Sequence, residues 1–317
     1  MTDLVTLGET MALFTARRTG LLRHARDFDL GVGGAESNVA IGVTRLGLRA
    51  AWIGRVGDDE FGALVRATLA GEHVDVSRAV VDAGAPTGLM VKGRRSADAV
   101  DVRYYRSASA GSRLRPDDLD PGLIRAARVL HVTGITPALS DSARDAVRAA
   151  VAEARDAGVF VSLDVNYRRA LWTPGAAAAG LRELVAAADA VFATEAEARL
   201  FTGGPESDGP AALARSLAAL GPRHVLVKLG ARGALAFCDG VVRRAEPYPV
   251  TEVDPVGAGD AFAAGWLADR LAGADPERCL ATACAAGACA VTASGDWESL
   301  PRRADLELLH RADGVDR

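Results

Sequence analysis

The segment VLHVTG, residues 129–134, is the first of four apolar runs that decide the fold class. The other three runs are VFVSLDV at 159–165, AVFAT at 190–194 and HVLVKLG at 224–230. Amphipathic segments rich in Ala, Arg and Glu lie near residues 141–157, 175–188, 195–202 and 210–220. Nearly continuous apolar strands that alternate with helices are typical of a parallel sheet covered on both faces. The sequence therefore predicts an α/β fold with a central, mostly parallel sheet flanked by helices on both faces.

The first third of the chain has a different pattern, in which polar and apolar residues alternate. VTLGETMALF at 5–14 and DFDLGVGG at 27–34 bracket a polar segment. TGLMVKG at 87–93 and DVRYYRS at 101–107 are joined by a charged turn, as in a hairpin. We expect the segments near 9–33 and 87–107 to form a small β-sheet lid on a single domain that spans residues 1–317. Its exposed edge predicts a homo-oligomer.

The composition narrows the classes of partner. The 317 residues include 37 basic and 41 acidic side chains, a net charge of -4, and 49% of them are hydrophobic. Without a block of basic residues, this balance argues against nucleic acid as a partner. The chain has no uninterrupted apolar stretch of about 18 residues and no leader-like start, so we expect no membrane partner and a cytoplasmic protein. The four cysteines lack zinc-ligand spacing and are expected to be apolar filler.

A glycine-rich turn leads into an apolar helix in DPVGAGDAFAAGW, residues 254–266. Gly257, Ala258 and Gly259 have almost no side chain, so their N–H groups can point outward from the start of a helix. The helix dipole favours an anion at that position. The next residue is a carboxylate, Asp260. The sequence therefore places a candidate anion-binding site and a candidate base next to each other.

A second glycine turn precedes a helix in GGAESNVAIGVTRLG, residues 33–47. Gly33 and Gly34 let a ligand approach the backbone closely, and the Asn38 amide both donates to and accepts from a polyhydroxylated ligand. Taken alone, a glycine turn followed by a helix cap explains this stretch equally well.

Together, the two glycine turns resemble the signatures of the ribokinase-like (PfkB) family of carbohydrate kinases. That family has a Gly-Gly/Asn element near its N-terminus and an Asp-x-x-Gly-Ala-Gly-Asp element near its C-terminus, and the resemblance here extends from about Val5 to Asp296. It implies a ribokinase-like fold and transfer of the γ-phosphoryl group of ATP to a sugar hydroxyl. Asp260 would be the general base, the N–H groups of 257–259 would form an anion hole, and the first glycine turn would contact the sugar.

Four further stretches resemble the family members that phosphorylate 2-keto-3-deoxygluconate. They are GETM at 8–11, YYRSASAGS at 104–112, HVTGITPALS at 131–140 and SLDVNYRRALW at 162–172. Strand alternation places Tyr104 and Arg106 on one face, with Tyr105 packed on the other, and Arg168 follows a strand at the ligand edge. Two guanidinium groups suit a carboxylate, which predicts a sugar acid as substrate. Surface salt bridging is the alternative for both arginines.

The resemblance places ATP along KLGARG, residues 228–233, and along the turn at 257–259. Its predicted contacts are Asn166, which would also face the sugar, together with Lys228, Gly230, Arg232, Gly233, Gly257 and Gly259. An ordinary strand and hairpin turn would give the same local pattern. The sequence has no Gly-x-x-x-x-Gly-Lys-Ser/Thr motif, which excludes a P-loop kinase mechanism.

The resemblance also implies Mg²⁺, which an Asn-x-x-Glu element helps to organise in the family. Here the matching stretch is TEAE, with Thr194 in place of Asn, and Glu197 is retained as an indirect metal contact. A monovalent cation beside the anion hole stays open. Asp296 would reach a substrate hydroxyl, with a surface acid at a helix end as the alternative. Met90 stands where sugar-acid kinases of this type often carry a tyrosine.

The sequence thus favours a sugar kinase that phosphorylates 2-keto-3-deoxygluconate to its 6-phosphate, with a small-molecule sugar acid and ATP as partners. Another sugar kinase of the same fold, acting on fructose, ribose or 2-keto-3-deoxygalactonate, is the first alternative. A sugar-acid sensor without catalysis is the second, and the presence of Asp260 argues against it.

Overall fold

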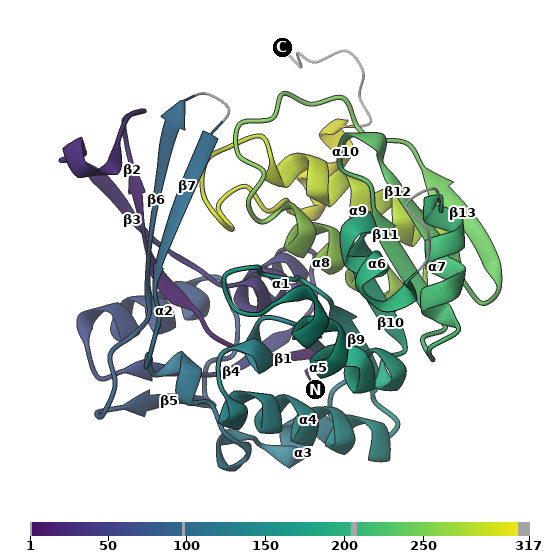
Figure 1. Ribbon diagram of the computed structural model, residues 1–317, viewed down its shortest axis with the longest axis horizontal. Coiled ribbons are helices and arrows are strands. Elements are labelled where there is room, and N and C mark those ends of the chain that lie inside the picture. Colours follow the sequence, from purple (N-terminus) through teal and green to yellow (C-terminus); the bar gives the residue numbers. More distant parts are fainter. Residues whose placement is uncertain (1, 97–98, 204–207, 310–317) are drawn as a thin grey trace.

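The computed structural model describes residues 2–96, 99–203 and 208–309. Two sheets organise these residues (Figure 1). The large sheet has nine strands in the order β13-β12-β11-β10-β9-β8-β1-β4-β5, and the small sheet has four in the order β3-β2-β6-β7. In Figure 1 the small sheet stands apart from the large one, beside the helices of the C-terminal third.

The strands are β1 Leu4–Leu7, β2 Met11–Ala16, β3 Phe28–Gly33, β4 Ala50–Gly57, β5 Ala79–Asp82, β6 Leu89–Ser96, β7 Ala99–Tyr105, β8 Val129–Thr133, β9 Phe160–Asp164, β10 Ala190–Thr194, β11 His224–Lys228, β12 Ala234–Cys238 and β13 Val241–Ala245. The α-helices are α1 Ala35–Arg45, α2 Glu60–Gly71, α3 Pro121–Arg125, α4 Asp141–Asp156, α5 Pro174–Ala187, α6 Glu195–Thr202, α7 Pro210–Ala218, α8 Ala258–Leu271, α9 Pro276–Ala290 and α10 Arg303–Leu309. A 3₁₀ turn, η5, spans Gly230–Arg232.

The large sheet is parallel from β5 to β11, and only β12 and β13 run antiparallel to their neighbours. Because successive strand residues point to opposite faces, Phe192 of β10 packs with α1, α8 and α9, whereas its neighbour Val191 packs with α4 to α7. Two apolar cores result, one on each face. The predicted α/β class with helices on both faces is confirmed.

The four apolar runs and the four helices between them form where the sequence predicts, within one or two residues at most ends. The segments near 9–33 and 87–107 supply all the strands of the small sheet, in which β6 and β7 are the predicted hairpin. Two residues of its tip, 97–98, lie outside the described residues. Among the residues described, no helix has the length and apolar character needed to cross a membrane.

Parallel strands leave their carboxyl ends at one edge of the sheet, where ligands bind in open α/β folds. Glu9 follows β1, Asp164 ends β9 and Lys228 ends β11 at this edge. The two glycine turns open α1 and α8, whose residues pack against each other in the same core. The fold therefore gathers the predicted site residues at the carboxyl edge of the large sheet, below the small one.

Candidate active site

The glycine turn before α8 has the backbone form that its sequence predicts. Gly257 precedes the helix with a φ of 82°, a left-handed conformation that favours glycine, and a β-carbon there would overlap the carbonyl oxygen of Asp296. Within the described residues, the amides of Gly257 and Gly259 donate to no backbone carbonyl, whereas the amide of Ala258 lies 3.4 Å from the carbonyl oxygen of Pro255. The helix start therefore retains donors for an anion.

Asp260 lies in the first turn of α8 and is 8% exposed. Two amides face its carboxylate: Nδ2 of Asn38 donates to Oδ2 at 2.8 Å, and Nδ2 of Asn166 lies 3.5 Å from Oδ1. Burial raises the pKa of Asp260 to about 7, against the hydrogen bond from Asn38 and the charges of Arg168 and Lys228. A carboxyl group with this pKa can accept a proton near neutral pH.

The turn before α1 brings the N-terminal glycines to the same place. A side chain on Gly33 would overlap the Met90 methyl group and a carboxylate oxygen of Asp296, and one on Gly34 would meet the backbone of Glu9. The lack of a side chain at Gly33 thus allows Asp296, in the chain after α9, to lie close to β3. Because Asn38 also holds Asp260, the two signature turns form one site.

Asn166 has a φ of 39°, a conformation in which Asn is among the favoured residues other than glycine. Its amide N–H lies 3.3 Å from Oδ1 of Asp164, which is buried at the end of β9. The Asn166 side chain reaches Oδ1 of Asp260, whereas Asn38 on α1 contacts Oδ2.

Lys228 at the end of β11 is paired with Asp164, with Nζ 2.9 and 2.8 Å from the two carboxylate oxygens. The ammonium also lies directly above Gly259, where an added β-carbon would be 3.3 Å from Nζ. Burial opposes the charge on Lys228, but the charges of Asp164 and Glu197 outweigh it and raise its pKa. Lys228 therefore stays a cation beside the anion-binding turn.

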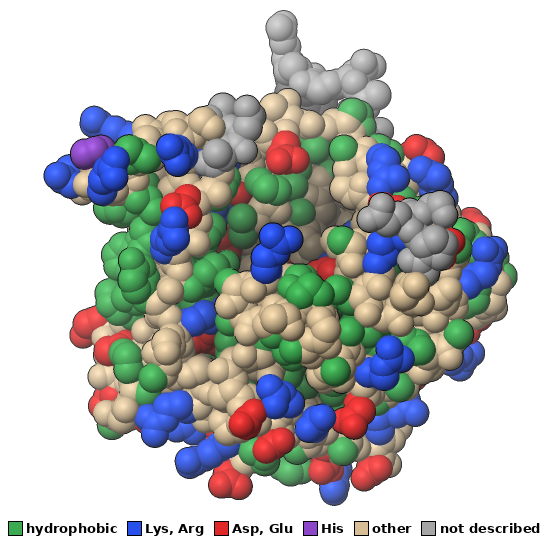
Figure 2. All heavy atoms as spheres, in the orientation of Figure 1, with side chains coloured by type: hydrophobic (Ala, Val, Ile, Leu, Met, Phe, Trp, Pro, Cys, Tyr) green, Lys and Arg blue, Asp and Glu red, His purple; other side chains and the backbone are tan. Residues whose placement is uncertain are grey.

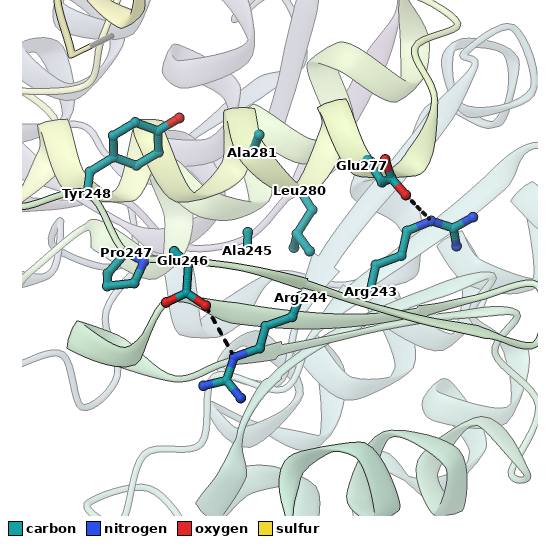
Figure 3. Close-up of a pocket in the computed structure, with 9 residues that line it drawn as sticks. All are labelled: Arg243, Arg244, Ala245, Glu246, Pro247, Tyr248, Glu277, Leu280 and Ala281. Atoms are coloured by element: carbon teal, nitrogen blue, oxygen red, sulfur yellow. Dashed lines mark ion pairs between the residues drawn. The ribbon is translucent and has the colours of Figure 1, made fainter. Parts of the chain in front are cut away.

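The predicted nucleotide turn follows β11. Gly230 and Gly233 both have left-handed φ values, 59° and 79°, and Arg232 forms an exposed ion pair with Glu195. A β-carbon on Gly233 would overlap the backbone at 245–247. That backbone lines a pocket of about 370 Å³ between β13 and α9, shown in Figure 3, whose lining residues are Arg243, Arg244, Ala245, Glu246, Pro247, Tyr248, Glu277, Leu280 and Ala281.

Glu197 sits at the start of α6 in a capping box. Its Oε2 accepts from the backbone N–H of Thr194 at 2.7 Å, the Thr194 hydroxyl caps the helix in return, and its Oε1 accepts from the backbone N–H of Tyr167 at 2.8 Å. Thr194 replaces Asn of the family element with another favoured N-cap residue, so the local turn is kept.

The described residues contain no group of three or more His, Cys, Asp or Glu side chains arranged to hold a metal ion. Mg²⁺ needs few protein oxygens because phosphates and water complete its shell. The carboxylates of Asp164 and Glu197 interact electrostatically, and each faces Lys228. Because Asp164 is paired with Lys228, Glu197 is the acid compatible with a Mg²⁺ ion held mainly by nucleotide phosphates.

The two predicted arginines are in different settings. Arg106 is partly buried and forms an ion pair with the buried Glu9, with its Nε 2.7 Å from Oε2, and Ser109 donates to the same carboxylate. The Tyr104 ring lies 5.5 Å from the Arg106 guanidinium carbon, on the same face as the strand pattern predicts. Tyr105, expected to pack on the other face, is instead 65% exposed. The ion pair that the sequence left open for Arg106 exists, but it is not on the surface.

Arg168 is exposed at the end of the segment that follows β9. Its charge lowers the pKa values of both Asp260 and Asp296 against the effect of their burial. Asp296 is 8% exposed, so the alternative of a surface acid is wrong for this residue. Burial raises the pKa of Asp296 to about 6, with the charge of Lys92 acting in the opposite direction.

Sequence reasoning missed three residues of the site: Glu9, Asp164 and Lys92. Glu9 and Asp164 follow or end strands of the parallel sheet, which is the signal that could have identified them. Lys92 was visible as one of only two lysines in the chain, yet nothing in the sequence near it indicates its partner, Asp254. Figure 2 shows a hollow between the small sheet and the helical body, with acidic and basic side chains around it.

A buried carboxyl group with a pKa near neutrality, a helix start with amides unpaired among the described residues and a partly buried lysine beside it are compatible with a phosphoryl-transfer site on this fold. Residues 1–303 match the pfkB family of carbohydrate kinases. The chain belongs to this family and is a carbohydrate kinase.

Named relatives support the same class. The chain is 41% identical to a 2-dehydro-3-deoxygluconokinase of Thermoproteus tenax, covering 98% of this chain and 95% of the relative. It is 39% identical to a fructokinase of Klebsiella pneumoniae, covering 87% and 90% respectively. A crystal structure of a putative ribokinase II from E. coli, in complex with ATP and Mg²⁺, has a TM-score of 0.90 at 28% identity and covers 98% of this chain and 99% of its own.

Proposed function

We propose that the chain transfers the γ-phosphoryl group of ATP to the 6-hydroxyl of 2-keto-3-deoxygluconate. The observation that carries the proposal is the position of Asp260, which is buried between two asparagine amides in the first turn of a helix that retains free N–H donors. Asp260 accepts the proton of the attacking hydroxyl while the oxygen forms its bond to phosphorus. The bond from phosphorus to the bridging oxygen breaks, and ADP leaves with that oxygen.

The backbone N–H groups at 257–259 stabilise the charge on the transferring group, and Lys228 adds a cation beside them. The nucleotide lies along Gly230–Gly233, whose backbone adjoins the pocket between β13 and α9. We assign the base or ribose to this pocket. Mg²⁺, when bound with the phosphates, would supply charge neutralisation, and Glu197 is the residue that would help to hold it, since Asp164 is already paired with Lys228.

The sugar acid occupies the hollow between the glycine turn at Gly33–Gly34 and the segment that carries Arg168. Arg168 is exposed and its charge acts on both Asp260 and Asp296, so its guanidinium is the group we propose for a substrate carboxylate. Arg106 is already paired with Glu9, which fixes its orientation, and we propose its guanidinium as a second, weaker positive group near the substrate. Asn38 and Asp296 are the polar groups proposed for the sugar hydroxyls.

A kinase of a neutral sugar such as fructose is the competing function, because the Klebsiella relative of that name is 39% identical to this chain. A coupled assay of ADP release with 2-keto-3-deoxygluconate, 2-keto-3-deoxygalactonate, fructose and ribose separates the two. We expect turnover of the keto-deoxy acids. Turnover of fructose or ribose without that of the acids would contradict the proposed role of Arg168.

The small sheet is proposed to pair two copies of the chain. Its edge strands are β3 and β7, and Leu30 and Tyr105 on these strands are 51% and 65% exposed. Figure 2 shows hydrophobic side chains on the outer side of this part of the molecule. Light scattering should give at least a dimer, and Tyr105→Arg should shift it towards the monomer, whereas Val241→Arg at the far edge of the large sheet should not. A monomeric parent protein would refute this pairing.

A further inference from the structure

Lys92 links the small sheet to the glycine turn by a buried ion pair. It lies on β6 and is 3% exposed, and its Nζ is 2.5 Å from Oδ2 of Asp254 and 3.8 Å from Oδ1 of Asp296. Asp254 is fully buried. Of the 36 other basic residues, 35 are arginine and one is Lys228, so a lysine at this position is unusual for the chain and supplies a compact point charge.

Asp254 is the first residue of the turn that carries the anion donors. Its Oδ1 accepts from the backbone N–H of Val256 at 3.3 Å, and its Oδ2 lies 3.5 Å from the backbone N–H of Gly295. Gly257, three residues on, packs against the backbone of Asp296. The carboxylate of Asp254 therefore ties the turn to the chain after α9, and the Lys92 ammonium lies at the junction.

A buried carboxylate needs a cation or a set of donors to compensate for lost hydration. At Asp254 that cation is already part of the chain. A metal ion bound to the same carboxylate would have to displace the ammonium or lie against it, and like charges repel strongly away from water. The residues present therefore do not fit the monovalent cation that the sequence left open beside this turn.

We propose that the ammonium group of Lys92 is the permanent cation of the turn Asp254–Gly257, so that nucleotide binding there needs no added monovalent cation. The inference rests on the proposed function only for the identity of the nucleotide. It assigns to Lys92 a positioning role, because it acts through Asp254 and not on the substrate.

The first test measures ADP affinity by calorimetry and melting temperature by fluorimetry, in potassium chloride and in tetramethylammonium chloride at equal ionic strength. Equal affinities and equal melting temperatures are expected in the two salts. A selective gain in either quantity with potassium would overturn the inference. Neither readout needs a sugar, so inactivity towards 2-keto-3-deoxygluconate would count against the proposed function alone, and the melting temperatures would still decide if ADP failed to bind.

The second test replaces the ammonium. Lys92→Ala should lower the melting temperature by about 10 °C, because it leaves Asp254 buried without its cation. Propylammonium supplies the three carbons and the ammonium group that the substitution removes. Added propylammonium or potassium should recover part of the lost melting temperature, whereas tetramethylammonium should not. Arg95→Ala, at an exposed position on the same strand, is the control and should respond to no salt. A Lys92→Ala protein that loses no stability, or that no small cation rescues, contradicts the inference, and if it does not fold, the first test decides.

Discussion

Asp260→Asn should stabilise the protein at pH 8 while it removes activity. The pKa of Asp260 is raised from 3.8 to about 7, with burial as the largest cause. Because folding raises this pKa, the protonated carboxyl group favours the folded state. This contribution to stability is complete at a pH below 3.8 and is lost as the pH rises through about 7. Ionised Asp260 thus costs the folded state roughly three pKa units, or about 4 kcal/mol, at pH 8.

The amide of asparagine has nearly the same shape and carries no charge, so the variant escapes this cost. We expect a gain of up to about 4 kcal/mol in the free energy of unfolding at pH 8, and a gain of only about 2 kcal/mol at pH 5, where the carboxyl is mostly protonated in the folded state. Turnover should fall by about 10² to 10⁴-fold because the proton acceptor is lost, while ATP and sugar-acid binding persist.

Urea unfolding of both proteins at pH 5 and pH 8 measures the stability difference, and the ADP-release assay measures turnover. Asp145→Asn on the exposed side of α4 is the control for adding an amide, and it should change stability little at either pH. A variant less stable than its parent at pH 8, or a difference that does not shrink towards pH 5, would refute the assignment of a buried, perturbed carboxyl. Retained turnover would refute its role as base.

Three further substitutions test the neighbours of Asp260. Arg168→Ala should raise the KM for the sugar acid by about 10 to 100-fold, with a smaller effect on that for ATP, in initial-rate kinetics; equal losses would indicate a damaged fold. Asn38→Ala should move the acidic limb of kcat/KM upward from about pH 7, since the Asn38 hydrogen bond lowers the pKa of Asp260; an unchanged limb contradicts this. Gly257→Ala should cost about 1 to 3 kcal/mol in urea unfolding, because its φ is 82°; an unchanged midpoint contradicts this.

The strands and helices of the large sheet could be predicted closely because each apolar run is buried on both faces of a sheet and each helix has a clear apolar side. The small sheet was predictable from a different pattern: one of its faces is open, so polar and apolar residues alternate along its strands. Tyr105 shows where alternation stops being informative. The pattern gives the face on which a residue lies, but only the neighbouring strands decide whether anything covers that face.

The predicted site residues lie together because strand ends and helix starts meet at one edge of a parallel sheet, a rule that needs only the order of elements. The ion pairs could not be predicted in the same way. Glu9 and Arg106 are 97 positions apart, and no local pattern joins them. Arg106 was predicted to bind a substrate carboxylate, but the Glu9 carboxylate already holds it, so Arg168 is the stronger candidate for that role.

The acids of the site differ in role because their partners differ in charge. Asp164 and Asp254 each form an ion pair with a lysine ammonium, at 2.8 and 2.5 Å. Among the described residues, Asp260 has only neutral amides within hydrogen-bonding distance, and its cationic neighbours act from farther away. A carboxylate oxygen in contact with an ammonium group is occupied by that contact and is not free to face a sugar hydroxyl. The asparagines orient Asp260 and leave its carboxylate without a cation in direct contact, which is why we propose Asp260, and not Asp164 or Asp254, as the base.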